Sequence, residues 1–206
     1  MKSKLKVLQV IPRLDFGGAE TGCYDLAHYL SEKNCKSYII TSGGKLLTYI
    51  KKDKVKLIRL PVHSKNPILI LFNAILISFI IIFLNIQIVH ARSRAPAWSC
   101  LLATKITRRK FVTTFHGTYN FKSRLKKLYN SVMLRSDLII AGSNFIFSHI
   151  QDNYKKYTKH EKKKLMVIFR GINTEYFDSK NVSSQKVNKL ITEWKIDQNN
   201  FIILMP

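Results

Sequence analysis

The stretch Lys6–Leu26, KVLQVIPRLDFGGAETGCYDL, combines an apolar run, a turn with two glycines and the first turns of a helix. The run is rich in β-forming residues without strict alternation, which is typical of a parallel strand buried on both faces. Pro12 ends this strand because proline cannot donate a hydrogen bond to a sheet ladder. We expect the pair Gly17-Gly18 to adopt backbone conformations closed to residues with a Cβ, and to let a ligand approach closely.

A helix that begins near Gly18 would point its free N–H groups, and the positive end of its dipole, into the crevice above the strand. Phosphate groups are commonly bound at such helix ends. Many α/β units have a strand–Gly-Gly–helix junction, so the junction alone indicates no particular ligand. It matches neither the dinucleotide fingerprint G-x-G-x-x-G nor the P-loop G-x-x-x-x-G-K-[ST].

The chain of 206 residues carries 35 Lys and Arg against 12 Asp and Glu, which gives a net charge of +23. Its hydrophobic share of 46% argues against global disorder, and its length suits one large domain or two small ones. The charge favours anionic partners, which are nucleic acid, phosphorylated metabolites or an anionic membrane surface. A bias toward Lys, Ile and Asn throughout the chain explains the same charge without any partner, and both interpretations stay open.

The cysteines indicate a reducing compartment. Cys23, Cys35 and Cys100 are odd in number and form no C-x-x-C pair, so three free thiols in the cytosol are the simplest explanation. The apolar run Val7–Ile11 is too short for a signal peptide, and no small-residue cleavage site follows it.

Apolar runs alternate with amphipathic segments along the chain, which predicts an α/β protein with a parallel sheet. The predicted strands are 7–11, 37–41, 55–60, 88–91, 110–115, 137–141, 165–169 and 201–205. The predicted helices are 19–33, 67–84, 95–107, 122–135, 144–154 and 185–194, with one or two helical turns at 46–51 and a basic surface loop at 155–164.

The segment Pro67–Leu84, PILILFNAILISFIIIFL, has only Asn73 and Ser78 as polar residues. As a helix it would be about 27 Å long, close to the thickness of the hydrocarbon core of a bilayer. Three interpretations stay open: a helix buried against the sheet, a monotopic helix on a membrane, and a spanning helix. The third would place a membrane span between two strands of one sheet.

Ligands of open α/β sheets bind outside the carboxyl ends of the strands. Four clusters fall at predicted strand ends, and they are Gly17-Gly18, Arg92–Arg94, His116-Gly117 and Arg170–Asn173. Arg170 suits a phosphate or carboxylate, and His116 suits a polarising or hydrogen-bonding role. The alternatives are a plain tight turn at the glycines, a structural loop histidine at His116, and solvated charges at the arginines.

No metal site is predicted, because the six histidines are scattered without H-x-x-x-H spacing or neighbouring carboxylates. G-x-S-x-G is absent, and no Ser-His-Asp or Cys-His set is evident.

Five motifs give the chain a resemblance to a known family. They are VLQVIPRLDFGGAE at 7–20, HARSRAPAW at 90–98, TTFHGTYN at 113–120, SDLIIAGSNF at 136–145 and VIFRGINTEYFD at 167–178. In this order and spacing they resemble the N-terminal, acceptor-side domain of the family-4 retaining glycosyltransferases of bacterial lipopolysaccharide and glycoconjugate assembly. The resemblance implies a Rossmann-like parallel sheet with helices on both faces, as one half of a two-domain GT-B architecture.

The same resemblance implies roles for individual residues. Gly17 and Gly18 would approach the diphosphate of a nucleotide-sugar donor, and His116 would be the catalytic residue that reaches the transferred sugar. Ser143 and Arg170 would also line the cleft. Four further residues would bind the acceptor or line the cleft, and they are Glu20, Arg92, Arg94 and Gly117. The family uses the nucleotide-sugar as a substrate and needs no cofactor and no metal.

The resemblance further divides the chain into residues 1–180, the Rossmann-like domain, and residues 181–206, an interdomain segment followed by FIILMP, which resembles the first strand of a donor-binding domain. The family's basic clamp on the leaving diphosphate belongs to that second domain. We therefore expect a truncated, half-length transferase that is inactive alone and acts with a separate C-terminal domain.

The family's acceptors are often membrane lipids or lipopolysaccharide, which implies a cytoplasmic protein peripheral to the inner face of the membrane. The basic segment Lys122–Lys127 and the apolar segment Pro67–Leu84 are candidates for an anionic membrane surface. The alternative function is a basic, non-catalytic α/β protein that binds nucleic acid or membrane. Against nucleic acid, the sequence has neither zinc-finger spacing nor an RRM-type aromatic–basic signature.

Overall fold

The computed structural model describes residues 4–119, 123–154, 165–172, 174–175, 177–197 and 201–203. The chain divides into two compact units, Met1–Phe169 and Arg170–Pro206. Each unit is described by itself. The predicted boundary after residue 180 stays a prediction.

The first unit contains one sheet of seven strands in the order β3-β2-β1-β4-β5-β6-β7, and every neighbouring pair is parallel. The strands are β1 Lys6–Val10, β2 Lys36–Thr41, β3 Val55–Arg59, β4 Ile88–Ala91, β5 Lys110–Phe115, β6 Leu138–Ala141 and β7 Leu165–Val167. All seven overlap segments that the sequence predicts as strands, and β1 and β2 begin one residue earlier than predicted.

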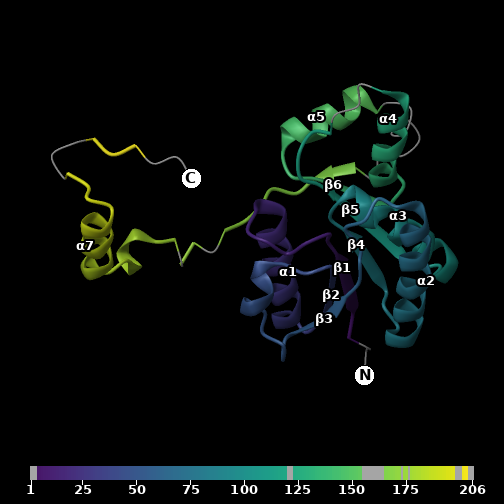
Figure 1. Ribbon diagram of the computed structural model, residues 1–206, viewed down its shortest axis with the longest axis horizontal. Coiled ribbons are helices and arrows are strands. Elements are labelled where there is room, and N and C mark those ends of the chain that lie inside the picture. Colours follow the sequence, from purple (N-terminus) through teal and green to yellow (C-terminus); the bar gives the residue numbers. More distant parts are fainter. Residues whose placement is uncertain are drawn as a thin grey trace. The chain divides into compact units, whose positions relative to one another are not determined.

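Helices cover both faces of the sheet, with α1 on one side and α2 and α3 on the other (Figure 1). Among its described residues, the helices of this unit are α1 Gly18–Glu32, α2 Pro67–Leu84, α3 Arg94–Thr107, α4 Arg124–Asn130 and α5 Asn144–Asn153, with short 3₁₀ turns η1 Lys45–Tyr49 and η2 Ser131–Leu134. The larger apolar cluster lies under α2, α3 and α5, and the smaller one lies between the sheet, α1 and η1. This is the predicted Rossmann-like α/β fold.

The predicted single helix 122–135 is wrong in part. Lys122 lies outside the described residues, and the rest forms α4 followed by the 3₁₀ turn η2. The change of helix type is accompanied by burial, because all four residues of η2 are buried. The Thr113 hydroxyl on β5 donates to the Met133 carbonyl over 2.6 Å, which holds this turn on the sheet.

The helix α2 has the predicted bounds, and its two ends are capped. Asn66 accepts a hydrogen bond from the Ile68 N–H over 2.9 Å, and Asn85 ends the helix in the left-handed conformation at φ 51°. Among the described residues, α2 is the one helix that is long and apolar enough to cross a membrane, and 28% of it is buried. The buried interpretation is right for one side of α2 only, because the other side exposes large apolar residues. The monotopic interpretation stays a prediction.

Within its described residues, the second unit contains a 3₁₀ turn, η4 Ser179–Asn181, and one helix, α7 Ser184–Glu193. The predicted strand 201–205 is wrong where the structure describes it, because Phe201, Ile202 and Ile203 form no strand and are exposed. An apolar run needs a neighbouring strand for its hydrogen bonds, and these residues have none. The predicted loop 155–164 lies outside the described residues.

Candidate functional site

The sheet register brings the carboxyl ends of four strands to one edge. Val10 of β1 is paired with Ala91 of β4, Ala91 with Thr113 of β5, and Phe115 with Ala141 of β6. The residues that follow these strands therefore lie along the same edge. They include the predicted site residues Gly17, Gly18, Arg92, His116, Gly117 and Ser143.

The loop between β1 and α1 is fixed by a turn that follows β2. Leu14 is fully buried, its N–H donates to the Gly43 carbonyl over 2.7 Å, and its carbonyl accepts from the Leu46 N–H over 2.9 Å. Gly44 has φ 141°, and a Cβ there would collide with the Leu14 backbone. Sequence reasoning missed this support for the site, although the consecutive glycines after β2 were a usable signal.

The special backbone predicted for Gly17-Gly18 is wrong. Gly17 is the N-cap of α1 with φ 178°, an extended conformation that any residue adopts, and Gly18 is the first residue of the helix. The Glu20 carboxylate folds back over this point, because a Cβ on Gly17 would stand 2.5 Å from Glu20 Oε2. An anion at the N-terminus of α1 must therefore displace the Glu20 side chain or lie beside it.

Arg92 is a buried cation, so the solvated alternative is wrong for it. Its side chain is 7% exposed, and its Nη1 donates to Gln9 Oε1 over 3.0 Å. The Gln9 amide in turn donates to the Cys23 carbonyl of α1 over 3.0 Å. A Cβ on Gly22 would stand 2.9 Å from Arg92 Nη2, so the absence of a side chain there leaves room for the guanidinium.

Two histidines lie beside Arg92. His90 on β4 is buried and bonds to the Thr114 hydroxyl of β5 over 2.7 Å. Burial lowers the pKa of His90 well below its usual value, and the charges of Arg92 and His116 lower it further. His90 is therefore neutral, with the charges of Arg92 and His116 near it. His116 itself is partly exposed at the end of β5.

The lowered pKa of His90 predicts that the folded state loses stability in acid. As pH falls through about 6.5, an unfolded His90 takes up a proton and the folded one does not, so stability decreases toward acid by at most about 1.4 kcal/mol per pH unit. We expect urea unfolding between about pH 8 and about pH 5 to show this slope, and His90→Asn to flatten it. The exposed His63 provides the control, because His63→Asn should keep the wild-type slope. An unchanged slope in His90→Asn contradicts the prediction.

Arg94 is held by aromatic and polar partners, so it too is more than a solvated charge. Its guanidinium stacks on the Tyr119 ring at 4.3 Å, and its Nη1 donates to Asn130 Oδ1 over 2.9 Å. Burial raises the pKa of the Tyr119 phenol to about 12. These contacts direct Arg94 toward α4 and the loop after β5, where it borders the carboxyl edge of the sheet.

The remaining predicted residues are placed as follows. Ser143 caps α5, since its hydroxyl accepts from the Ile146 N–H over 3.2 Å. Gly117 has open space around its α-carbon, so sterics do not require a glycine there. Arg170 is exposed and belongs to the second unit, and Asn173 lies outside the described residues. The assignment of Arg170 to the cleft stays a prediction.

Within the described ranges, no three His, Cys, Asp or Glu side chains come together as a metal site. Burial raises the pKa of the Cys23 thiol to about 12 and also raises that of Cys100, so both thiols are protonated at neutral pH. The predicted polar groups that the structure places at this edge are the side chains of Arg92, His116 and Ser143 and the backbone N–H groups at the start of α1.

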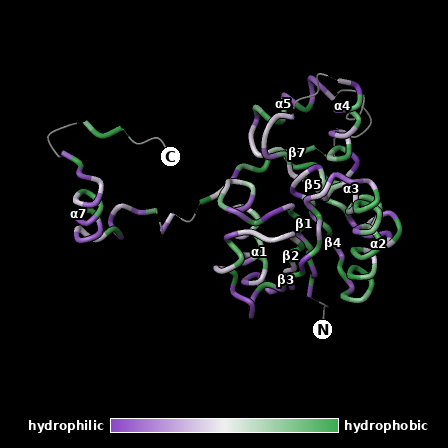
Figure 2. Tube along the Cα trace, in the orientation of Figure 1, coloured by the Kyte–Doolittle hydropathy of each residue, from purple (hydrophilic) through white to green (hydrophobic). Residues whose placement is uncertain are grey.

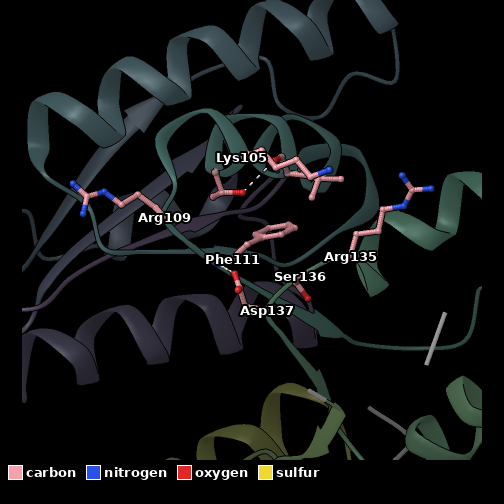
Figure 3. Close-up of a pocket in the computed structure, with 8 residues that line it drawn as sticks. Lys105, Arg109, Phe111, Arg135, Ser136 and Asp137 are labelled. Carbon is pink, nitrogen blue, oxygen red and sulfur yellow. Dashed lines mark hydrogen bonds between the residues drawn. The ribbon is translucent and has the colours of Figure 1, made fainter. Parts of the chain in front are cut away.

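A cavity of about 210 Å³ lies elsewhere, near the amino ends of β5 and β6 (Figure 3). Its two arginines point away from it: Arg109 donates to Asn85 Oδ1 over 2.9 Å, and Arg135 lies over the Trp98 ring at 5.5 Å. The Asp137 carboxylate accepts a hydrogen bond from the Phe111 N–H over 2.8 Å. None of the predicted site residues lines this cavity, so we place the site at the carboxyl edge.

Solved structures of the same fold are similar to most of this chain. A glycosyltransferase from Rickettsia africae ESF-5 is 44% identical with a TM-score of 0.81, covering 95% of this chain and 51% of that one. Anabaena HepE in complex with UDP and glucose is 16% identical with a TM-score of 0.68, covering 92% and 50%. A UDP-N-acetylglucosamine 2-epimerase from Rickettsia bellii is 14% identical with a TM-score of 0.59, covering 91% and 51%.

The chain thus spans about half the length of the solved structures it matches. A search of curated proteins finds no match. The family model described as Glycosyltransferase Family 4 matches residues 16–176, which include the start of α1, the buried Arg92 and the histidine after β5. The seven-stranded parallel sheet, its carboxyl-edge site and this match together show that the chain belongs to glycosyltransferase family 4, as one Rossmann-like half of the GT-B fold.

Proposed function

We propose that the chain is the acceptor-side half of an enzyme that transfers a hexosyl group from a nucleotide-sugar to a lipid-linked or lipopolysaccharide-type acceptor. The observation that carries the proposal is the convergence of the α1 N-terminus, buried Arg92 and His116 on one edge of the sheet. A positive helix end and a buried guanidinium stabilise the charge of a diphosphate, and a histidine can hydrogen-bond a sugar hydroxyl. Anabaena HepE, which shares the fold, has been solved with UDP-glucose.

In this proposal the donor phosphates approach the α1 N-terminus at Gly17 and Gly18 after the Glu20 side chain moves aside, and His116 contacts the transferred sugar. Ser143 would line the cleft at the start of α5, and Arg170 keeps the phosphate-binding role that the family resemblance implies. Glu20, Arg94 and Gly117 lie toward the acceptor. No metal takes part, because neutral and cationic groups stabilise the leaving diphosphate.

We further propose that this half does not catalyse transfer alone. Departure of a nucleoside diphosphate needs cationic groups on both sides of the cleft, and one side belongs to a donor-binding domain. The protein would work at the cytoplasmic face of a membrane, where lipid-linked acceptors are available. The net charge of +23 supports this location.

Calorimetric titration with UDP and UDP-glucose tests the proposal. We expect weak or no heat with this chain alone, and saturable binding and turnover once a family-4 donor-binding domain is added. Adenosine diphosphate is the control nucleotide. Failure of UDP-glucose and of other nucleotide-sugars to bind in either case would refute the transferase function.

A further inference from the structure

The outer side of α2 is an exposed apolar row. Five residues of the helix are buried against the fold, and they are Asn73, Ala74, Ile77, Ser78 and Ile81. The opposite side exposes Ile68, Leu71, Phe72, Ile75, Phe79, Ile82 and Phe83, with Phe79 67% and Phe83 90% exposed. Figure 2 shows α2 as a largely hydrophobic helix at the outer edge of the first unit. We call these seven side chains the α2 row, and a contiguous row of this size indicates an interaction surface.

The helix is fixed in the fold, so it cannot leave it to span a membrane. The Ser99 hydroxyl of α3 donates to the Ile70 carbonyl over 2.9 Å, and the Asn73 amide donates to the Pro61 carbonyl over 3.1 Å. At the other end the Lys6 ammonium donates to the Leu84 carbonyl over 2.7 Å. A spanning orientation would break these bonds and remove five residues from the core. What remains is a helix that presents one side outward.

The stretch of sequence around α2 is basic and lacks carboxylates. No Asp or Glu occurs in the sequence between Asp53 and Asp137, a stretch that includes all of α2 and α3. Exposed Lys65 precedes the helix, and exposed Arg108 lies beside Arg109, which bonds to Asn85 at the end of α2. The apolar row is thus flanked by cations at both ends.

The apolar α2 row and the cations at its ends together favour one kind of binding partner. A second copy of the chain would bring another charge of +23 to the same surface, which opposes self-association. Nucleic acid matches the cations but not a row of Ile, Leu and Phe. An anionic bilayer matches both, because acyl chains accept the apolar side chains and headgroups accept the lysines and arginines.

We infer that α2 docks flat on an anionic lipid bilayer, with the α2 row inserted below the headgroups and Lys65, Arg108 and Arg109 among them. A helix of 18 residues is about 27 Å long and would lie in the interface plane. The inference deepens the proposed membrane location of the transferase. It depends on the surface of α2 and not on donor chemistry, so the two can fail separately.

Vesicle flotation without any nucleotide tests this inference. The probes are vesicles of three parts phosphatidylcholine to one part phosphatidylglycerol, and vesicles of phosphatidylcholine alone. We expect the chain to bind the anionic vesicles, and raising NaCl from about 0.1 M to about 0.5 M to weaken binding severalfold. The double variant Phe79→Gln/Phe83→Gln should lose at least tenfold in vesicle affinity. Its melting temperature should be unchanged, because both side chains are exposed in the fold.

The matched control is Tyr29→Gln/Tyr49→Gln, which removes two exposed aromatics beside the opposite face of the sheet. It should bind vesicles like the wild type. Wild-type binding by the Phe variant, an equal loss in the Tyr variant, or equal binding to neutral vesicles would overturn the inference. Sedimentation that shows a wild-type dimer and a monomeric Phe variant, with vesicle binding unchanged, would assign the row to a second copy instead. Failed nucleotide-sugar titrations with intact vesicle binding would refute the transferase proposal alone.

Discussion

Replacement of His116 by alanine is expected to lower the rate of sugar transfer about 100- to 1000-fold, the usual effect of removing one positioned group at a reacting centre. His116 follows β5 at the carboxyl edge of the sheet. Its charge lowers the pKa of the buried His90, as the charge of Arg92 does. The side chain is partly exposed and not part of the apolar core, so the fold should survive its loss. The measurement is kcat for transfer by this chain together with a donor-binding domain.

Two further variants test whether a loss of rate in His116→Ala comes from His116 itself. His28→Ala removes a histidine of α1 whose ring bonds to the Tyr24 carbonyl and the Lys51 N–H, away from the carboxyl edge, and it should keep the wild-type rate. His116→Asn keeps a hydrogen-bond donor and should recover part of the loss. A wild-type rate for His116→Ala would remove His116 from the site.

Much of the fold could be predicted from the sequence because its signals are local. Apolar runs fix the positions of all seven strands, and Asn66 followed by Pro67 marks the start of α2. Seven parallel strands then require their ligand site at the carboxyl edge. The strand predicted at 201–205 fails for the complementary reason, since a strand also needs a neighbour that no local pattern specifies.

The details of the site depend on contacts between distant residues, which the sequence does not show. Arg92 looks like any surface charge until Gln9, in a neighbouring strand, supplies its acceptor. Gly17-Gly18 looks like a conformational requirement, but the requirement lies at Gly44, which passes close to Leu14. In both cases a side chain's role is set by what the tertiary fold places against it.

Arg92→Met is expected to reduce both stability and activity, and the two losses have different causes. The variant leaves Gln9 Oε1 without the guanidinium that donates to it, and an unsatisfied buried acceptor costs about 1 to 3 kcal/mol of unfolding free energy. It also removes a buried positive charge beside His90 and under α1, where the low dielectric strengthens its attraction for a bound diphosphate. Loss of such a charge should weaken donor binding about 10- to 100-fold. Urea unfolding and calorimetry with the donor-binding domain measure the two effects.

The double variant Gln9→Leu/Arg92→Met separates the effect of Arg92 on stability from its effect on donor binding. It replaces both buried polar partners by apolar side chains, so stability should rise above that of Arg92→Met, since neither a lone acceptor nor a buried charge remains. Loss of the bond from the Gln9 amide to the Cys23 carbonyl limits this gain. Donor affinity should stay as low as in Arg92→Met, because no apolar side chain attracts a diphosphate. If the double variant recovers affinity along with stability, Arg92 acts only through the fold. If it recovers stability alone, the buried guanidinium is kept at a cost to stability because the cleft needs its charge.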